Sequence, residues 1–227
     1  MVSCYYQLTN SKYKGGDNMT TGTQADLYSV MHDRKSVRVY DPAATISKEE
    51  LSEMIKEATS APSSSNLQPW RFLVIQDTAV KKELRAISNN QEQAETASAV
   101  IAVLGDIEMY KKVEQIYTQN VTEGHMPEAS KEAMIASTNR VYPNVSDEVR
   151  KNIATFDAGL ISMQIMLIAK EKGYDTVPMG GFDKEKFAER FELPSNVVPI
   201  VLIAVGKAAG PAYGSSRLPM NEILKFI

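Results

Sequence analysis

The segment Ala61-Pro62-Ser63-Ser64-Ser65-Asn66-Leu67-Gln68-Pro69-Trp70-Arg71-Phe72 is the most informative part of this chain. It connects a predicted amphipathic helix, Ser47 to Ser60, with an apolar run, Phe72 to Ile75, that predicts a strand. Helix-to-strand connections usually need only a few residues, and this one is longer. Its side chains are rich in hydroxyl and amide groups, and the two prolines restrict its backbone. The composition favours a loop, residues 61–69, that holds a small polar ring or a phosphate.

The alternative interpretation of this serine-rich loop (residues 61–69) is a solvated linker. A flexible linker does not normally end in Pro-Trp-Arg-Phe leading directly into a strand, because large aromatic side chains are placed in cores and binding sites. We therefore favour a binding loop.

Hydrophobic patterns elsewhere predict a layered domain of helices and strands. Ser47 and Glu50 form a capping box, and Thr78 is the expected N-cap of a later helix. Continuous apolar runs predict buried strands from Ala99 to Leu104 and from Val197 to Val205. Strands separated by helices indicate a mixed α and β domain.

The two ends of the domain are predicted from composition. Residues 1–22 are polar and lack periodicity, which predicts a disordered tail before a single domain of residues 23–227. Met19 is an alternative start within that tail, and Thr23 is a plausible cap of the first helix.

Three further stretches complete the prediction. Residues 107–152 have a helical pattern with a narrow apolar edge, which predicts either a cover over the binding site or an ordinary surface insertion. Ala158 to Ala169 is apolar on nearly all sides, so we expect a helix buried in the domain or against a second subunit. Val177 to Asp183 predicts a turn.

Composition excludes several classes of function. A net charge of -3 gives no electrostatic reason to expect nucleic acid or an anionic membrane as a partner, and the apolar runs are shorter than a bilayer span. A single cysteine, Cys4, excludes an internal disulfide and fits a reducing cytoplasm. Cys4, His32 and His125 are too widely spaced to predict a metal site or a histidine-based nucleophile.

Two clusters could bind an anion or a flat ligand. Arg34-Lys35-Ser36-Val37-Arg38 places three cations and a hydroxyl together, and Arg217 is a natural second ligand for a phosphate; solvated surface is the alternative. In Pro178-Met179-Gly180-Gly181 the glycines let the backbone approach a flat ligand, and an ordinary turn is the alternative.

In this order, these motifs resemble the FMN-dependent nitroreductase family from about Gln24 to the C-terminus. The resemblance implies an α+β fold with a mostly antiparallel central sheet surrounded by helices. It also implies an intertwined homodimer that holds FMN at the interface, with both chains contributing to each site.

The resemblance assigns roles position by position. Arg34 and Arg217 resemble the phosphate ligands, and Arg38 falls where the family has a cation near flavin N1. Ser215 and Gly180 depart from relatives that have lysine and glutamate there, so only a backbone N–H role carries over to Gly180. The implied cofactor-binding residues are Arg34, Lys35, Ser36, Arg38, Ser63, Ser64, Ser65, Asn66, Asn90, Gln93, Pro178, Met179, Gly180, Gly181 and Arg217.

The resemblance implies an FMN-dependent oxidoreductase that takes electrons from NADH or NADPH and reduces nitroaromatics, quinones or similar small acceptors in turn. No catalytic side chain is needed, because the flavin performs the redox chemistry. The alternatives are a dehydrogenation or reductive dehalogenation on the same scaffold, a non-catalytic flavin-binding protein, and a purely structural dimer.

Overall fold

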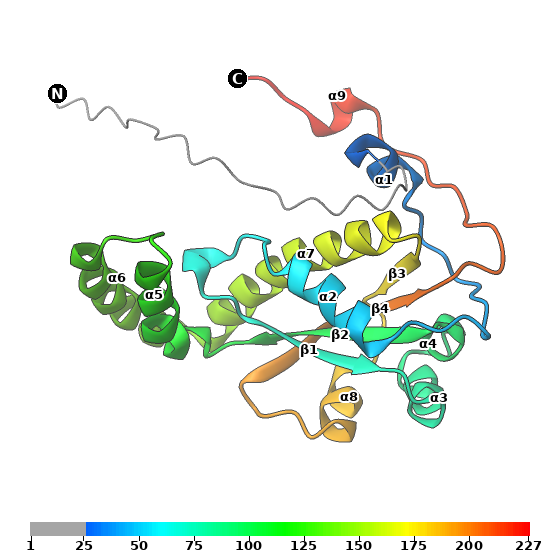
Figure 1. Ribbon diagram of the computed structural model, residues 1–227, viewed down its shortest axis with the longest axis horizontal. Coiled ribbons are helices and arrows are strands. Elements are labelled where there is room, and N and C mark those ends of the chain that lie inside the picture. The colour runs from blue at the N-terminus through cyan, green and yellow to red at the C-terminus, as the bar shows by residue number, and fades with distance from the viewer. Residues whose placement is uncertain (1–25) are drawn as a thin grey trace.

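Four antiparallel strands in the order β1-β2-β4-β3 form the central sheet of the computed structural model, which describes residues 26–227 (Figure 1). The strands are β1 (Trp70–Ile75), β2 (Ala99–Asp106), β3 (Asp175–Met179) and β4 (Val197–Gly206). β2 pairs with β4 from Ala99 opposite Val205 to Asp106 opposite Val197, and every residue of β2 is buried. The two predicted buried strands are therefore the two central strands of the sheet.

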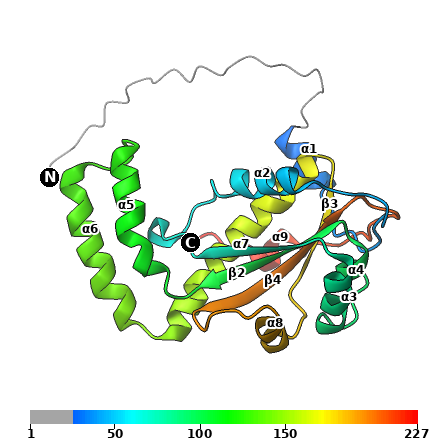
Figure 2. The same cartoon turned by 60° about the horizontal axis from the view of Figure 1, so that its bottom comes forward.

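Helices cover both faces of the sheet (Figures 1 and 2). α2 (Lys48–Ala58) and α7 (Asp147–Glu171) lie on one face; α3 (Thr78–Ile87), α4 (Gln93–Thr96) and α8 (Lys184–Arg190) lie on the other. Successive side chains of a strand point to opposite faces. Ile101 of β2 accordingly packs in the cluster beneath α2 and α7, whereas Ala102 packs with α3 and α8. The result is the α+β arrangement that the sequence predicted.

The remaining elements lie at the ends of the domain. α5 (Val113–Thr122) and α6 (Glu128–Val141) stand as a pair beside the sheet, flanked by the 3-10 turns η2 (Met109–Lys112) and η3 (Tyr142–Asn144) (Figure 2). They share a small core with Leu67 of the serine-rich loop. The other elements are α1 (Leu27–Asp33), η1 (Ser64–Asn66) and α9 (Met220–Ile223).

The structure corrects several predicted boundaries. Val177 to Met179 belong to strand β3 rather than to a turn; β3 is an edge strand, where proline is tolerated because one side of the strand needs no hydrogen-bond donors. Asp77, not Thr78, caps α3, since its carboxylate accepts a hydrogen bond from the Val80 amide. β1 begins at Trp70, two residues before the predicted strand.

Helix α7 is longer than the apolar run that predicted it. It begins at Asp147 after Ser146 caps it, so the helical segment predicted for residues 107–152 ends earlier, before α7. Its 25 residues are long and apolar enough to span a membrane by composition, but one face packs on the sheet through residues such as Ile161 and Ile165. The opposite face exposes Phe156 (65% exposed) and Met163 (39% exposed).

The N-terminal predictions lie partly outside the described residues. The tail of residues 1–22 and the cap at Thr23 belong to the part that the structure does not describe. The described part of α1 begins at Leu27, and the Asp26 carboxylate caps it by accepting a hydrogen bond from the Ser29 amide.

Candidate functional site

The basic segment Arg34 to Arg38 lies beside strand β3. The Val37 amide donates to the Thr176 carbonyl at 3.1 Å, and Ser36 forms a bridge with Thr176. Val37 is buried in the core, and side chains alternate along an extended segment. Ser36 and Arg38 therefore face away from the core.

The segment after β4 brings the other end of the chain to the same place. The Ala209 amide donates to the Val39 carbonyl, and the Asp41 amide donates to the Lys207 carbonyl, both at 2.9 Å. Beyond this pairing, Tyr213, Gly214, Ser215 and Arg217 line a pocket of about 430 Å³. Its other lining residues are Met31, His32, Arg34, Lys35, Ser36 and Arg38, and we call this the basic pocket.

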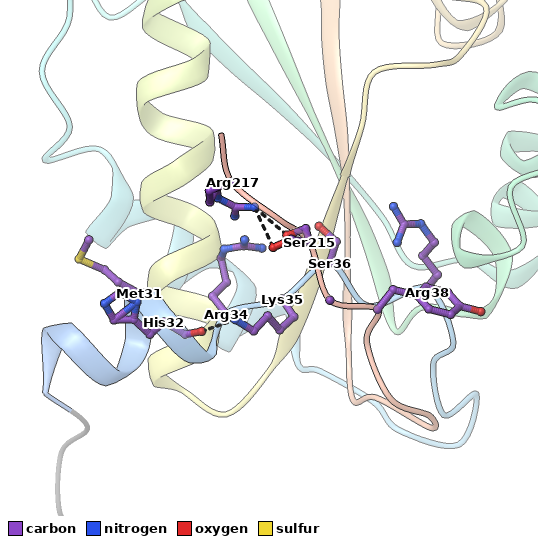
Figure 3. Close-up of a pocket in the computed structure, with 10 residues that line it drawn as sticks. Met31, His32, Arg34, Lys35, Ser36, Arg38, Ser215 and Arg217 are labelled. Atoms are coloured by element: carbon purple, nitrogen blue, oxygen red, sulfur yellow. Dashed lines mark hydrogen bonds between the residues drawn. The ribbon is translucent and has the colours of Figure 1, made fainter. Parts of the chain in front are cut away.

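The basic pocket carries positive charge without a carboxylate among its lining residues. The Arg34 Nε is buried and has no hydrogen-bond partner within residues 26–227. Among the residues that the structure describes, the Arg217 guanidinium bonds only to Ser215 and Ser216 of its own loop, at 2.8–3.3 Å. Figure 3 shows Arg34 and Arg217 close to Ser215, with Arg38 set apart. Uncompensated guanidinium groups with a nearby hydroxyl suit a phosphate group.

Pro178 and Met179 end strand β3, and Gly180 and Gly181 follow them. The Asn89 and Gln91 side chains both donate to the Gly181 carbonyl at 2.9 Å, so this backbone is held in place. A Cβ added at Gly180 would meet nothing within 4 Å, so the chain leaves open space beside Gly180.

The amide cluster near Gly181 differs in detail from the sequence prediction. Gln93 is buried and donates to the Gln91 side chain at 2.9 Å, so it supports the contact with Gly181 indirectly. Asn90 is exposed in a left-handed conformation. The sequence analysis missed Asn89 and Gln91, because spacing alone does not separate the members of one run of amides.

The serine-rich loop lies away from the basic pocket of its own chain. Its Ser64 bonds to Asp157 of α7, and Asp157 precedes the end of α7 at Glu171 by 14 residues. At about 1.5 Å per residue this is about 20 Å along the helix. Ser63, Ser64, Ser65 and Asn66 are absent from the lining of the basic pocket. Within one chain the structure therefore brings together the cations but not the loop.

Asp157, Tyr117 and Tyr142 contact the serine-rich loop and were not identified from the sequence. The only sequence feature that pointed to Asp157 was its position as a carboxylate next to an otherwise apolar helical run. Burial raises the pKa of Asp157 above its usual value, and hydrogen bonds from Ser64 partly oppose that rise.

Comparisons with known proteins identify the family of this chain. Residues 31–207 match the model of the nitroreductase family. YdgI of Bacillus subtilis, named among the NAD(P)H nitroreductases, is 45% identical over 88% of this chain and 97% of its own. The CLA biosynthesis enone reductase of Lactiplantibacillus plantarum is 33% identical over 89% of this chain and 94% of its own.

Solved structures confirm the predicted nitroreductase-like fold. A crystal structure from Exiguobacterium sibiricum, described as a nitroreductase in complex with FMN, superposes with a TM-score of 0.86. It is 42% identical and covers 92% of this chain and 100% of its own. The match spans the sheet, the basic segment and the serine-rich loop, and the chain belongs to the nitroreductase family.

Proposed function

We propose that this chain is an FMN-dependent NAD(P)H oxidoreductase that reduces nitroaromatics, quinones or similar small acceptors. The observation that carries the proposal is the basic pocket, in which Arg34 and Arg217 meet from opposite ends of the chain. Membership of the family and the FMN named with the Exiguobacterium structure support the choice of cofactor.

The residues of the basic pocket fit the parts of FMN. Arg34 and Arg217 hold the phosphate, because a buried, unpartnered Nε and a guanidinium bonded only to its own loop are available to an anion. Lys35 and Ser36 flank that phosphate. Arg38 lies farther along the pocket (Figure 3) and would supply positive charge toward N1 and the C2 carbonyl of a bound ring system.

In this proposal the backbone at Gly180 and Gly181 would lie against the flavin ring, with Pro178 and Met179 before it and Asn90 at the pyrimidine edge. The buried Gln93 would act there through its hydrogen bond to Gln91. The hydrogen bonds from Asn89 and Gln91 keep the Gly181 backbone fixed, and the open space at Gly180 admits a flat ring. When bound, FMN supplies the redox chemistry, accepting a hydride from NADH or NADPH at N5 and passing electrons to the acceptor. If donor and acceptor use the same site in turn, the kinetics would be ping-pong.

A homodimer completes the site. Val149, Phe156 and Met163 recur every seven residues on the outer face of α7, and all three are exposed in the single chain. Such a stripe on a long helix is typical of a helix-to-helix seam. Pairing two α7 helices brings the serine-rich loop of one chain, with Ser63, Ser64, Ser65 and Asn66, toward the basic pocket of its partner.

The proposal is tested by removing Arg217. Within residues 26–227 the Arg217 side chain hydrogen-bonds only to its own loop, so we expect Arg217→Ala to give a normally folded dimer that releases FMN during gel filtration. The matched control is Arg190→Ala, which removes an arginine of α8 that pairs with Glu83 and does not line the basic pocket. Full retention of the yellow cofactor by Arg217→Ala would refute the phosphate assignment.

Turnover separates an enzyme from a flavin-binding protein. Mixing the holoprotein anaerobically with NADH or NADPH should bleach the flavin, and adding a nitroaromatic, quinone or conjugated enone should restore its colour. The enone is included because one relative is named an enone reductase. If neither NADH nor NADPH bleaches the flavin, the protein is not a reductase, and the alternative of a non-catalytic flavin-binding protein stands.

A further inference from the structure

The serine-rich loop is held in a conformation that its own residues do not favour. Ser65, Asn66 and Gln68 have φ angles of 51°, 52° and 46°, in the left-handed region. Apart from asparagine, residues other than glycine rarely occupy that region, so the conformations of Ser65 and Gln68 persist only where surrounding contacts enforce them.

The first enforcing contact is a buried carboxylate. The Ser64 amide donates to both oxygens of Asp157, at 3.1 Å and 3.0 Å, and the Ser64 hydroxyl donates to Oδ1 at 3.0 Å. Asp157 is 0% exposed, and no cation pairs with it within residues 26–227. A buried carboxylate without a counter-charge is costly, and the three hydrogen bonds from Ser64 offset part of that cost.

The second enforcing contact comes from the helices of residues 107–144. The Tyr117 hydroxyl donates to the Ser65 carbonyl at 3.0 Å, and the Tyr142 hydroxyl donates to the Ser65 hydroxyl oxygen at 3.2 Å. Leu67 is buried in the same small core as both tyrosines. These contacts hold the loop while leaving Ser65 and Asn66 exposed.

We propose that Asp157, Tyr117 and Tyr142 form a clamp that fixes the serine-rich loop in the shape needed to close over the cofactor of the partner subunit. Asp157 is the positioning residue of this clamp, since it touches the loop and not the basic pocket. The inference rests on the proposed function, because it requires FMN in the basic pocket.

The clamp also joins the loop to the helices that stand beside it. Tyr117 belongs to α5 and Tyr142 to η3, and both bond to the residue next to Ser64. A displacement of α5 and η3 would therefore be transmitted to the loop. In this proposal, α5 and η3 move together with the part of the loop that contacts the cofactor.

The test compares FMN binding by three purified full-length variants. Asp157→Asn keeps the side-chain volume but turns an amide donor toward the Ser64 amide, and we expect at least about tenfold weaker FMN affinity, as for loss of a hydrogen bond to a charged group. Tyr117→Phe removes only one hydroxyl and should weaken FMN less. The matched control is Ser162→Ala in the same helix, whose buried hydroxyl has no hydrogen-bond partner in the described chain.

Apoprotein melting temperatures separate positioning from simple stability. The clamp predicts weaker FMN binding by Asp157→Asn with a melting temperature close to that of Ser162→Ala. Wild-type FMN affinity in Asp157→Asn would overturn the clamp. A lower FMN affinity that is accompanied by an equally lowered apoprotein melting temperature would also overturn it. Weak FMN binding by Arg217→Ala alongside normal binding by Asp157→Asn would refute the clamp and leave the proposed function standing.

Mixed dimers test whether the clamp acts across the interface. A dimer of one Asp157→Asn chain and one Arg217→Ala chain has one site with both an intact pocket and an intact loop. Random mixing should therefore restore wild-type affinity to about a quarter of all sites. If the loop served the pocket of its own chain, no site would be intact, and the absence of restoration would overturn action in trans.

Discussion

Truncation of Phe156 should weaken the dimer with little effect on the fold of each chain. Complete burial of a phenylalanine is worth about 1.5–3 kcal/mol. Because 65% of Phe156 is exposed in the single chain, the interface can gain about 1–2 kcal/mol from each copy. Two-fold symmetry doubles this to about 2–4 kcal/mol, so Phe156→Ala should raise the dimer dissociation constant about 30- to 1000-fold.

Sedimentation equilibrium of the FMN-free protein over a range of concentrations measures this constant. The matched control is Val74→Ala, which truncates an apolar side chain, 40% exposed, on the edge strand β1. The control should dimerise as the wild type does. If Phe156→Ala has an unchanged dissociation constant, the outer face of α7 is not the seam, and the shared site loses its structural basis.

Three further results are expected. Phe187→Ala should lower the unfolding free energy by about 3–5 kcal/mol in urea titrations, because the ring is fully buried under α8. Ser47→Ala should lower it by about 1 kcal/mol, since the hydroxyl caps α2 by accepting from the Glu50 amide; a melting curve measures this. Burial raises the folded-state pKa of Asp157, so the folded protein binds more protons between the usual value of 3.8 and that raised value. As pH rises through that interval, the unfolding free energy of the wild type should therefore fall more steeply than that of Asp157→Asn. Equal pH dependence of the unfolding free energy in the two proteins would contradict this prediction.

The sequence was sufficient for features that depend on local pattern. The central strands β2 and β4 were predicted because each is a continuous apolar run buried on both faces. The capping box at Ser47 and Glu50 is likewise a local motif, and both of its hydrogen bonds are present. The fold followed from a family resemblance carried by short motifs, and solved structures confirm it.

The features that the sequence did not predict depend on contacts distant in the chain. β3 is short and contains Pro178, and it becomes a strand only because β4 pairs with it along one side. Asp157 bonds to Ser64, 93 residues away, so no local pattern reveals the partner. The sequence also could not predict that the serine-rich loop lies away from the basic pocket, because this distance depends on where α7 places Asp157 in the fold.

Two segments of the chain, one near each end, form the two walls of the basic pocket. These segments leave the ribosome at very different times during synthesis. The sheet is complete once Gly206 has been synthesised, whereas Ser215 and Arg217 follow it, and none of residues 207–227 is buried. A nascent chain can thus assemble its core, with Arg34 in place, before Arg217 of the basic pocket has been synthesised. A ligand bound by both walls would fasten this otherwise loosely attached terminus, so depletion of the vitamin that supplies the flavin would expose it to proteases first.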